Sequence, residues 1–222
     1  ENASYIFNLP TDDVTKEQRY LGKVTVHGAW RDMQGARLSD SLMKDGYIRT
    51  PTECQADINA YRKRVTGIED YFRWCRRQVI EHHYAENSWG RRLYFTYDRF
   101  GDEVYRRVYS YYPQSEIADW MNQLGLVPFW WYIQDLAARE GQPVGAINVH
   151  AHDALVFSAK PQYAYDLTKF LVTSLEQARQ LYGVSLSIPC EIKLGTSWKG
   201  DVSWKRLPSQ AVFEKAVHGL KH

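Results

Sequence analysis

The stretch AINVHAHDALVF, residues 146–157, carries two short apolar runs on either side of the polar group at 150–153. Apolar runs of this length around a polar tip predict a tight β-hairpin. An aspartate at such a tip is exposed and rigidly held, and Mg²⁺ prefers carboxylate oxygens as ligands. We therefore expect Asp153 to be a candidate metal ligand, with an ordinary turn residue as the alternative reading.

A second pattern lies near the start of the chain, where Arg19, Lys23, His27 and Arg31 recur at steps of four. On an α-helix such a series covers about 120° of one face. Like charges at this spacing repel by roughly 0.2–0.5 kcal/mol per pair, so the stripe weakens an isolated helix. A bound polyanion, such as a nucleotide triphosphate or a nucleic-acid backbone, would make the stripe stabilise the helix instead. A solvated basic face is the alternative.

Helical signals precede strand signals along the chain, which is typical of an α+β fold. Thr15 with Gln18 three residues later has capping-box spacing at the start of the basic-striped helix. The predicted segments are helices at 15–30, 36–44, 50–84, 116–139 and 162–182, and strands at 91–95, 104–109, 146–149, 155–157 and 184–194. No internal repeat or flexible linker interrupts them.

Composition excludes several classes of protein. With 44% hydrophobic and 14% aromatic residues, the 222-residue chain can bury a sizeable core, and disorder is excluded. A net charge of +2 argues neither for nor against nucleic acid. The three widely separated cysteines predict reduced thiols in a cytoplasmic protein. No apolar run has the length of a membrane span, so no membrane partner is expected.

Several aromatic and basic side chains are expected to be structural. Trp120, Trp130 and Trp131 have helical spacing and are predicted to lie in the core or to pack against helices, with base stacking as the alternative. Arg62 and Arg76 are predicted to lie on solvated helix faces, with contact to nucleic-acid phosphates as the alternative.

Segments in order over nearly the whole chain resemble the motifs of family A DNA polymerases, with phage enzymes as the nearest type. Residues 19–28, RYLGKVTVHG, resemble the motif B helix, R-x(3)-K-x(3)-[F/H]-G, and residues 149–157 resemble motif C. The other similar segments are IFNLP at 6–10, GRRLYF at 90–95, Arg106 with PQSEIAD at 113–119, and EIKLGTSW at 191–198.

This resemblance implies a fragment of the polymerase right-hand fold. Residues 1–85 would form a helical fingers portion with the motif B helix, and residues 86–222 the C-terminal half of the palm with an antiparallel sheet. It also implies DNA-directed DNA synthesis, a nucleotidyl transfer in DNA replication, with primer–template DNA and dNTPs as partners.

By the same resemblance, Arg19 and Lys23 bind the triphosphate of the incoming dNTP, and Lys23 stands where the family's proposed general acid for pyrophosphate departure lies. His27 occupies the position of the aromatic residue that packs on the nucleotide's sugar and base. Asp153 is one of two aspartates that bind Mg²⁺, and His152 contacts the primer terminus.

Primer–template contacts near the minor groove are implied for Arg106 and Gln114, and an amide can meet the acceptors that every base pair presents there. The chain departs from the family where motif B ends in Tyr-Gly, because Arg31-Asp32 stands at that place. The contact on the template side of the insertion site would then fall to Arg31 or to the neighbouring Trp30.

The family's other essential aspartate, in motif A, lies upstream of motif B, as do the thumb and any exonuclease domain. Two metal ions about 3.5–4 Å apart need more than one carboxylate. We therefore expect the C-terminal part of a split polymerase, which shares two Mg²⁺ ions with a complementary chain that supplies motif A and the thumb, with or without an exonuclease. The start at Glu1 without Met fits a split, truncated or processed chain.

Two other functions stay open. Arg31 and Ala154, the latter at the position of a secondary carboxylate, favour a polymerase-like subunit that binds DNA without catalysis. The H-x-H pair at 150–152 resembles the zinc pair of amidohydrolase-type barrels, although a barrel of about 250 residues does not fit in the chain that remains after it.

Overall fold

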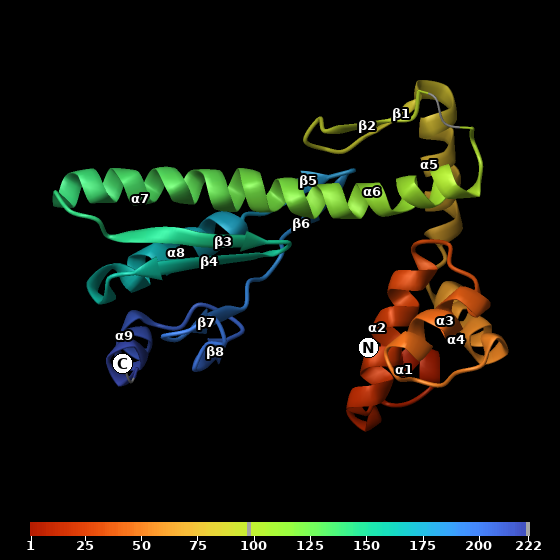
Figure 1. The fold of residues 1–222 in the computed structure, drawn as a ribbon, viewed down its shortest axis with the longest axis horizontal. Helices are drawn as coiled ribbons and strands as arrows, with labels where there is room; N and C mark the ends of the chain where they lie inside the picture. Colours follow the sequence, from red (N-terminus) through yellow and green to blue (C-terminus); the bar gives the residue numbers. More distant parts are fainter. Residues whose placement is uncertain (97–98, 221–222) are drawn as a thin grey trace. The chain divides into compact units, whose positions relative to one another are not determined.

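The structure is a computed structural model that describes residues 1–96 and 99–220. It divides into two compact units, an N-terminal unit of residues Glu1–Gln114 and a C-terminal unit of residues Ser115–His222, which are described separately (Figure 1). Helices dominate both units, and the described strands pair into four two-stranded antiparallel sheets. The predicted α+β class is therefore confirmed. No helix among these residues is long and apolar enough to cross a bilayer.

The N-terminal unit is mainly helical. Its elements are α1 (Asn2–Phe7), η1 (Thr11–Asp13), α2 (Lys16–Ala29), α3 (Gly35–Lys44), α4 (Pro51–Arg64), α5 (Ile68–His82), β1 (Tyr84–Glu86), β2 (Arg92–Tyr94) and α6 (Asp102–Trp120), which continues into the C-terminal unit. The predicted capping box at the start of α2 is confirmed, because the Gln18 N–H donates to Thr15 Oγ1 at 3.1 Å and the Thr15 N–H donates to Gln18 Oε1 at 3.0 Å.

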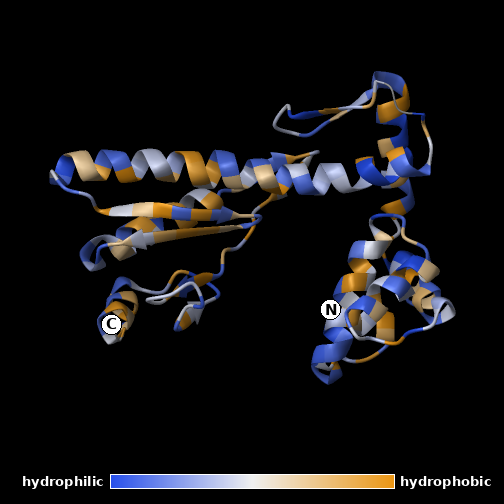
Figure 2. Cartoon of the chain, viewed as in Figure 1, coloured by the Kyte–Doolittle hydropathy of each residue, from blue (hydrophilic) through white to orange (hydrophobic). Residues whose placement is uncertain are grey.

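The striped helix α2 packs through the side opposite its charges. Leu21, Thr25 and Ala29 are buried there, and Figure 2 shows hydrophobic and hydrophilic residues alternating along the helix. Gly22 allows the closest approach, since a Cβ added to it would lie 2.7 Å from the Cβ of Ala3 in α1. Only a residue without a side chain lets α1 and α2 meet so closely.

The strand predicted at 104–109 is wrong, because these residues form the first half of α6. Val104, Val108 and Tyr112 recur every four residues and are all buried, which is the spacing of one helix face. The β-branched and aromatic residues that suggested a strand thus form the buried face of a helix that packs on the core. Strand β2 pairs instead with β1, in a register that sets Ala85 opposite Leu93.

Four other predicted boundaries change. The helix predicted at 50–84 is two helices, α4 and α5, separated by residues 65–67. The helix predicted at 162–182 ends at Leu175, and the strand predicted at 184–194 is two short strands. Pro113, expected before a helix that starts at 116, lies inside α6.

The C-terminal unit combines helices with three hairpins. After the end of α6 its elements are η2 (Met121–Leu126), α7 (Val127–Glu140), β3 (Gly145–Ala151), β4 (Ala154–Ala159), η3 (Pro161–Tyr163), α8 (Ala164–Leu175), β5 (Arg179–Leu181), β6 (Val184–Leu186), β7 (Ile192–Leu194), β8 (Val202–Trp204) and α9 (Gln210–Gly219). η2 follows α6 in the chain with no residue between them, and α7 follows η2 in the same way. Trp120 ties this helix to α8, because its indole N–H donates to the Leu175 carbonyl at 2.8 Å.

The hairpin predicted at 146–157 is confirmed as β3 and β4. Ala151 pairs with Ala154, so His152 and Asp153 form the two-residue turn, and His152 has φ 56°. A positive φ at the first turn residue matches the right-handed twist of hairpin strands. The strands pack on α7 through Phe157, whose ring lies 4.8 Å from that of Phe129.

The tryptophans divide between core and surface. Trp120 is 3% exposed, as predicted, whereas Trp130 and Trp131 are 45% and 62% exposed. The core position expected for these residues is therefore wrong for the last two, whose rings lie edge to face with centroids 4.6 Å apart.

Candidate nucleotide and metal site

The four residues of the basic stripe are all exposed. Arg19, Lys23 and His27 lie on α2, while Arg31 lies just beyond its last residue. Neither Arg19, Lys23 nor Arg31 makes an ion pair with a described residue. Since the opposite side of the helix is buried, the charges of this face are held towards solvent by packing behind them.

Three members of the stripe line one pocket of about 350 Å³. Arg19, Lys23 and His27 form one wall together with Val26 of α2. Residues in and next to α1 and η1 also line the pocket, namely Glu1, Asn2, Ala3, Thr11 and Val14. The structure thus brings the three residues predicted to bind the nucleotide to one concave surface. Two cations with several hydrogen-bond donors each suit a phosphate-bearing ligand.

His27 is the neutral member of this wall. Its partial burial lowers the pKa of the imidazole below its ordinary value, and the charges of Arg31 and Lys23 lower it further. At neutral pH the ring is therefore uncharged and can pack against a flat ligand group without a desolvated charge.

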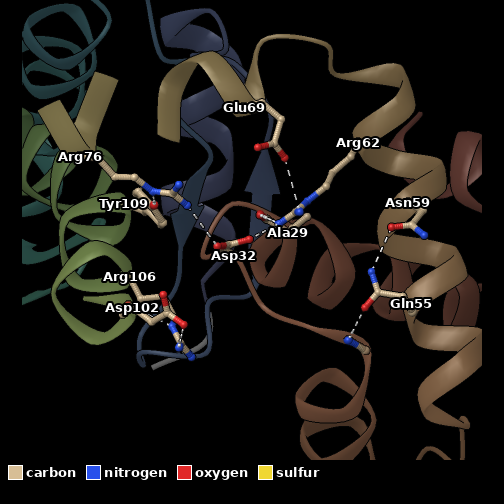
Figure 3. Close-up of polar contacts among 11 residues, drawn as sticks. Ala29, Asp32, Gln55, Asn59, Arg62, Glu69, Arg76, Asp102, Arg106 and Tyr109 are labelled. Atoms are coloured by element: carbon tan, nitrogen blue, oxygen red, sulfur yellow. Dashed lines mark hydrogen bonds and ion pairs between the residues drawn. The ribbon is translucent and has the colours of Figure 1, made fainter. Parts of the chain in front are cut away.

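The turn that follows α2 is held in place by side-chain contacts with α4 and α5. The Trp30 indole N–H donates to the Tyr61 hydroxyl at 2.8 Å, and its ring lies edge to face on Tyr71 at 5.4 Å. Asp32 binds Arg62 of α4 at 2.8 Å and Arg76 of α5 at 3.8 Å (Figure 3). The expectation that Arg62 is simply solvated is wrong, because its side chain is 19% exposed and bonded to this carboxylate.

This ion pair could not be predicted from a sequence pattern, because thirty residues separate Asp32 from Arg62. The one available signal was local, namely an acidic residue directly after a basic stripe.

Arg106 and Gln114 both lie on α6, eight residues apart, which corresponds to about 12 Å along the helix. Gln114 is exposed, and Arg106 forms an ion pair with Asp102 at 3.6 Å (Figure 3). That pair is between neighbours on one partly exposed helix turn, and such pairs contribute little energy, so Arg106 can exchange it for a phosphate. Their contacts with primer and template stay predictions.

Asp153 and His152 stand exposed at the turn between β3 and β4. Within the described part of the chain, no side chain bonds or pairs with the Asp153 carboxylate. His150 is exposed three residues earlier, on β3. An open carboxylate on a rigid hairpin is suited to accept an incoming cation. Lys23 belongs to the other unit, so each half of the predicted site is described within its own unit.

The residues at the hairpin fit Mg²⁺ only in part. Asp153 offers one hard oxygen ligand, which is the donor type that Mg²⁺ prefers. Within residues 1–96 and 99–220, no group of three or more His, Cys, Asp or Glu side chains could hold a metal ion. A complete site therefore needs oxygen ligands from outside these residues or from a bound phosphate.

Comparison with known proteins finds matches in sequence and in structure. It is 29% identical over 206 residues to DNA polymerase I of Treponema pallidum (strain Nichols), a match that covers 88% of this chain and 19% of the relative. The POL domain of Pol1 from M. smegmatis, solved in complex with DNA primer-template and dNTP, has a similar fold with a TM-score of 0.66 at 22% identity. That match covers 83% of this chain and 31% of the other.

The chain thus spans about a fifth of the curated relative and about a third of the solved one. A family model described as DNA polymerase family A matches residues 1–200, which is most of the chain. The 222 residues belong to DNA polymerase family A.

Proposed function

We propose that these residues form part of a DNA-directed DNA polymerase, in which the basic face of α2 binds the triphosphate of the incoming dNTP. The observation that carries the proposal is the pocket on α2, where Arg19, Lys23 and His27 meet on one wall. Family membership supports this use of the pocket, because the three residues match the motif B pattern. The solved relative with primer-template and dNTP has the same fold.

Each pocket residue has a separate task in this proposal. Arg19 and Lys23 neutralise the charge on the phosphates, and Lys23 donates a proton to the departing pyrophosphate. General acid catalysis of this kind contributes about 10²–10⁴-fold to a rate. His27, neutral because of its lowered pKa, packs against the sugar and base of the nucleotide.

The hairpin of β3 and β4 has the second task. Asp153 would hold magnesium with one carboxylate, and bound magnesium would supply positive charge against the transferring phosphate. His152, next to it in the turn, would contact the primer terminus. Arg106 and Gln114 on α6, with Trp30 and Arg31 after α2, would contact the primer–template.

The division of labour follows the family resemblance. Residues 1–85 would serve as a portion of the fingers and residues 86–222 as the C-terminal half of the palm. Since two ions need more than one carboxylate to hold them, the aspartate of motif A and the thumb would, in this proposal, come from a complementary polypeptide. The likeness to phage enzymes stays a prediction, because the relative described above is bacterial.

Primer extension tests the proposal. The chain is assayed with dNTPs and Mg²⁺, first alone and then with a candidate complementary polypeptide that carries the missing aspartate. Lys23→Ala should lower kcat by about 10²–10⁴-fold. Lys16→Ala is the matched control, because Lys16 is exposed on the same helix and lies outside the pocket. Equal losses in both variants would reject the pocket, and extension by the chain alone would reject the complementary polypeptide.

A second function, DNA binding without catalysis, is favoured by Arg31 and Ala154, which depart from the family pattern. Asp153→Ala separates the two functions. Lost synthesis with retained primer–template binding supports catalysis, whereas unchanged synthesis supports the binding function. The zinc-barrel alternative is wrong, because the described strands are paired antiparallel whereas that barrel is built from parallel strands.

A further inference from the structure

The turn that ends α2 has the backbone of a motif that usually contains glycine. The Met33 N–H donates to the Gly28 carbonyl at 2.9 Å, and the Asp32 N–H donates to the Ala29 carbonyl at 3.2 Å. These two bonds define a Schellman motif, whose left-handed residue is usually glycine. Here that residue is Asp32, with φ 54°. Asp and Asn adopt this conformation more readily than other residues with a side chain, and the Asp32 side chain here has partners of its own.

The Asp32 carboxylate binds arginines from two other helices, one at each oxygen. Arg62 of α4 lies 2.8 Å from Oδ1, and Arg76 of α5 lies 3.8 Å from Oδ2 (Figure 3). Arg62 also donates to the Ala29 carbonyl at 3.3 Å, near the negative end of the α2 dipole. One aspartate thus connects the last turn of α2 with both α4 and α5.

Both arginines are held by further contacts. Arg76 donates to the Tyr109 hydroxyl of α6, and its guanidinium lies 5.4 Å from the centroid of the Tyr105 ring. Arg62 also lies 3.5 Å from Glu69. Because the partners are already fixed, the carboxylate binds to a rigid frame and loses little by ordering mobile side chains.

Asp32 lies next to the face of α2 that is proposed to bind the nucleotide. Arg31 precedes Asp32 and is exposed, and its charge acts on His27 in the pocket wall. Trp30 is fixed on its other side by the hydrogen bond to Tyr61. The direction of Arg31 is therefore set by a backbone that is held at both neighbouring residues.

We infer that Asp32 is a positioning residue at the insertion site, where Arg31 is proposed to contact the template that pairs with the incoming nucleotide. Its bonds to Arg62 and Arg76 hold the last turn of α2, and this keeps Arg31 on the same face as Lys23. Asp32 touches no reacting atom and acts through Arg31. The inference rests on the proposed function of the α2 pocket.

The test uses Asp32→Asn and Arg31→Gln in the assembled form that extends a primer. Asparagine tolerates the left-handed backbone, so Asp32→Asn removes the charge and leaves the turn possible. We expect each variant to raise the KM for dNTP about tenfold with kcat within about twofold, because Lys23 and Asp153 are unchanged. The double variant should resemble Arg31→Gln alone, since both changes remove the same contact.

Asp40→Asn is the matched control, with the same charge change at an exposed position of α3. Hydrogen exchange on the full chain gives a readout that is independent of activity. The amides of Asp32 and Met33 should exchange faster in Asp32→Asn and not in Asp40→Asn.

Three results would overturn the inference. They are unchanged exchange in Asp32→Asn, faster exchange with an unchanged KM, and KM effects that multiply in the double variant. Failure of the proposed function is distinguishable, because then the unchanged enzyme itself would neither bind dNTP nor extend a primer, and the role of Asp32 would fall with it.

Discussion

Replacing Gly22 by alanine should separate α1 from α2 and disturb the pocket between them. The new Cβ would lie 2.7 Å from the Cβ of Ala3 and 2.9 Å from its Cα, whereas carbon atoms in favourable contact are about 3.5–4.0 Å apart. The short helix α1 must therefore move by about 1 Å. Asn2 and Ala3 line the pocket, so the movement reaches its wall.

Two effects of opposite sign decide the magnitude of this change. Alanine in a helix interior is favoured over glycine by about 1 kcal/mol. Overpacking costs about 1–3 kcal/mol, and here the clashing atoms include backbone rather than the end of a flexible side chain. We expect a net loss of about 1 kcal/mol in the free energy of unfolding, which lowers the Tm of a unit of this size by about 4 °C.

Thermal unfolding followed by circular dichroism, together with binding of Mg²⁺–dATP to the chain, measures both consequences. Gly67→Ala is the control, because its φ is negative and nothing lies within 4 Å of the new Cβ. That control should leave Tm unchanged or raise it slightly. A Gly22→Ala variant with unchanged or higher Tm and with wild-type nucleotide binding would refute the close packing of α1 on α2.

Three shorter predictions follow from single contacts. Gly35→Ala should destabilise the N-terminal unit by about 2–3 kcal/mol in chemical denaturation, because its Cβ would lie 2.3 Å from the Pro51 carbonyl oxygen, and a loss under about 0.5 kcal/mol would contradict this. Arg31→Gln should raise the pKa of His27 in an NMR titration. Because that pKa is lowered in the folded chain, the stability contribution of His27 is complete above pH 6.5 and is lost as the pH falls. An unchanged His27 pKa in the variant would show that Arg31 is not a cause of the shift. Burial raises the pKa of Cys75 to about 12, so its thiol should react with a disulfide reagent only after unfolding, and rapid labelling in the native state would contradict its burial.

Local rules explain which elements could be predicted from the sequence. The capping box at Thr15 and the hairpin around Asp153 depend on residues three or fewer apart, and both are confirmed. The face of α2 followed from a spacing of four, which the helix reproduces. In these segments neighbouring side chains and the backbone favour the same structure.

Tertiary packing explains where the prediction failed. The segment 104–109 has strand-like residues, yet Val104 and Val108 gain more by burial on the core of the N-terminal unit as parts of a helix. Trp130 and Trp131 are large aromatic residues of a type expected in the core, yet both lie on the surface. The ion pair between Asp32 and Arg62 joins residues thirty positions apart, and no spacing rule reaches that far.

The basic stripe lowers the free energy of unfolding only slightly because of the contacts behind and beside it. Three like-charged pairs at four-residue spacing would cost roughly 1 kcal/mol in total. His27 removes two of these pairs, since its lowered pKa leaves it neutral and only Arg19 and Lys23 repel each other across one turn. Burial of one side chain such as Leu21 contributes about 1.5–3 kcal/mol and outweighs that repulsion. The face can therefore stay charged and unpaired while the unit remains folded, and the repulsion that persists is relieved when an anion binds.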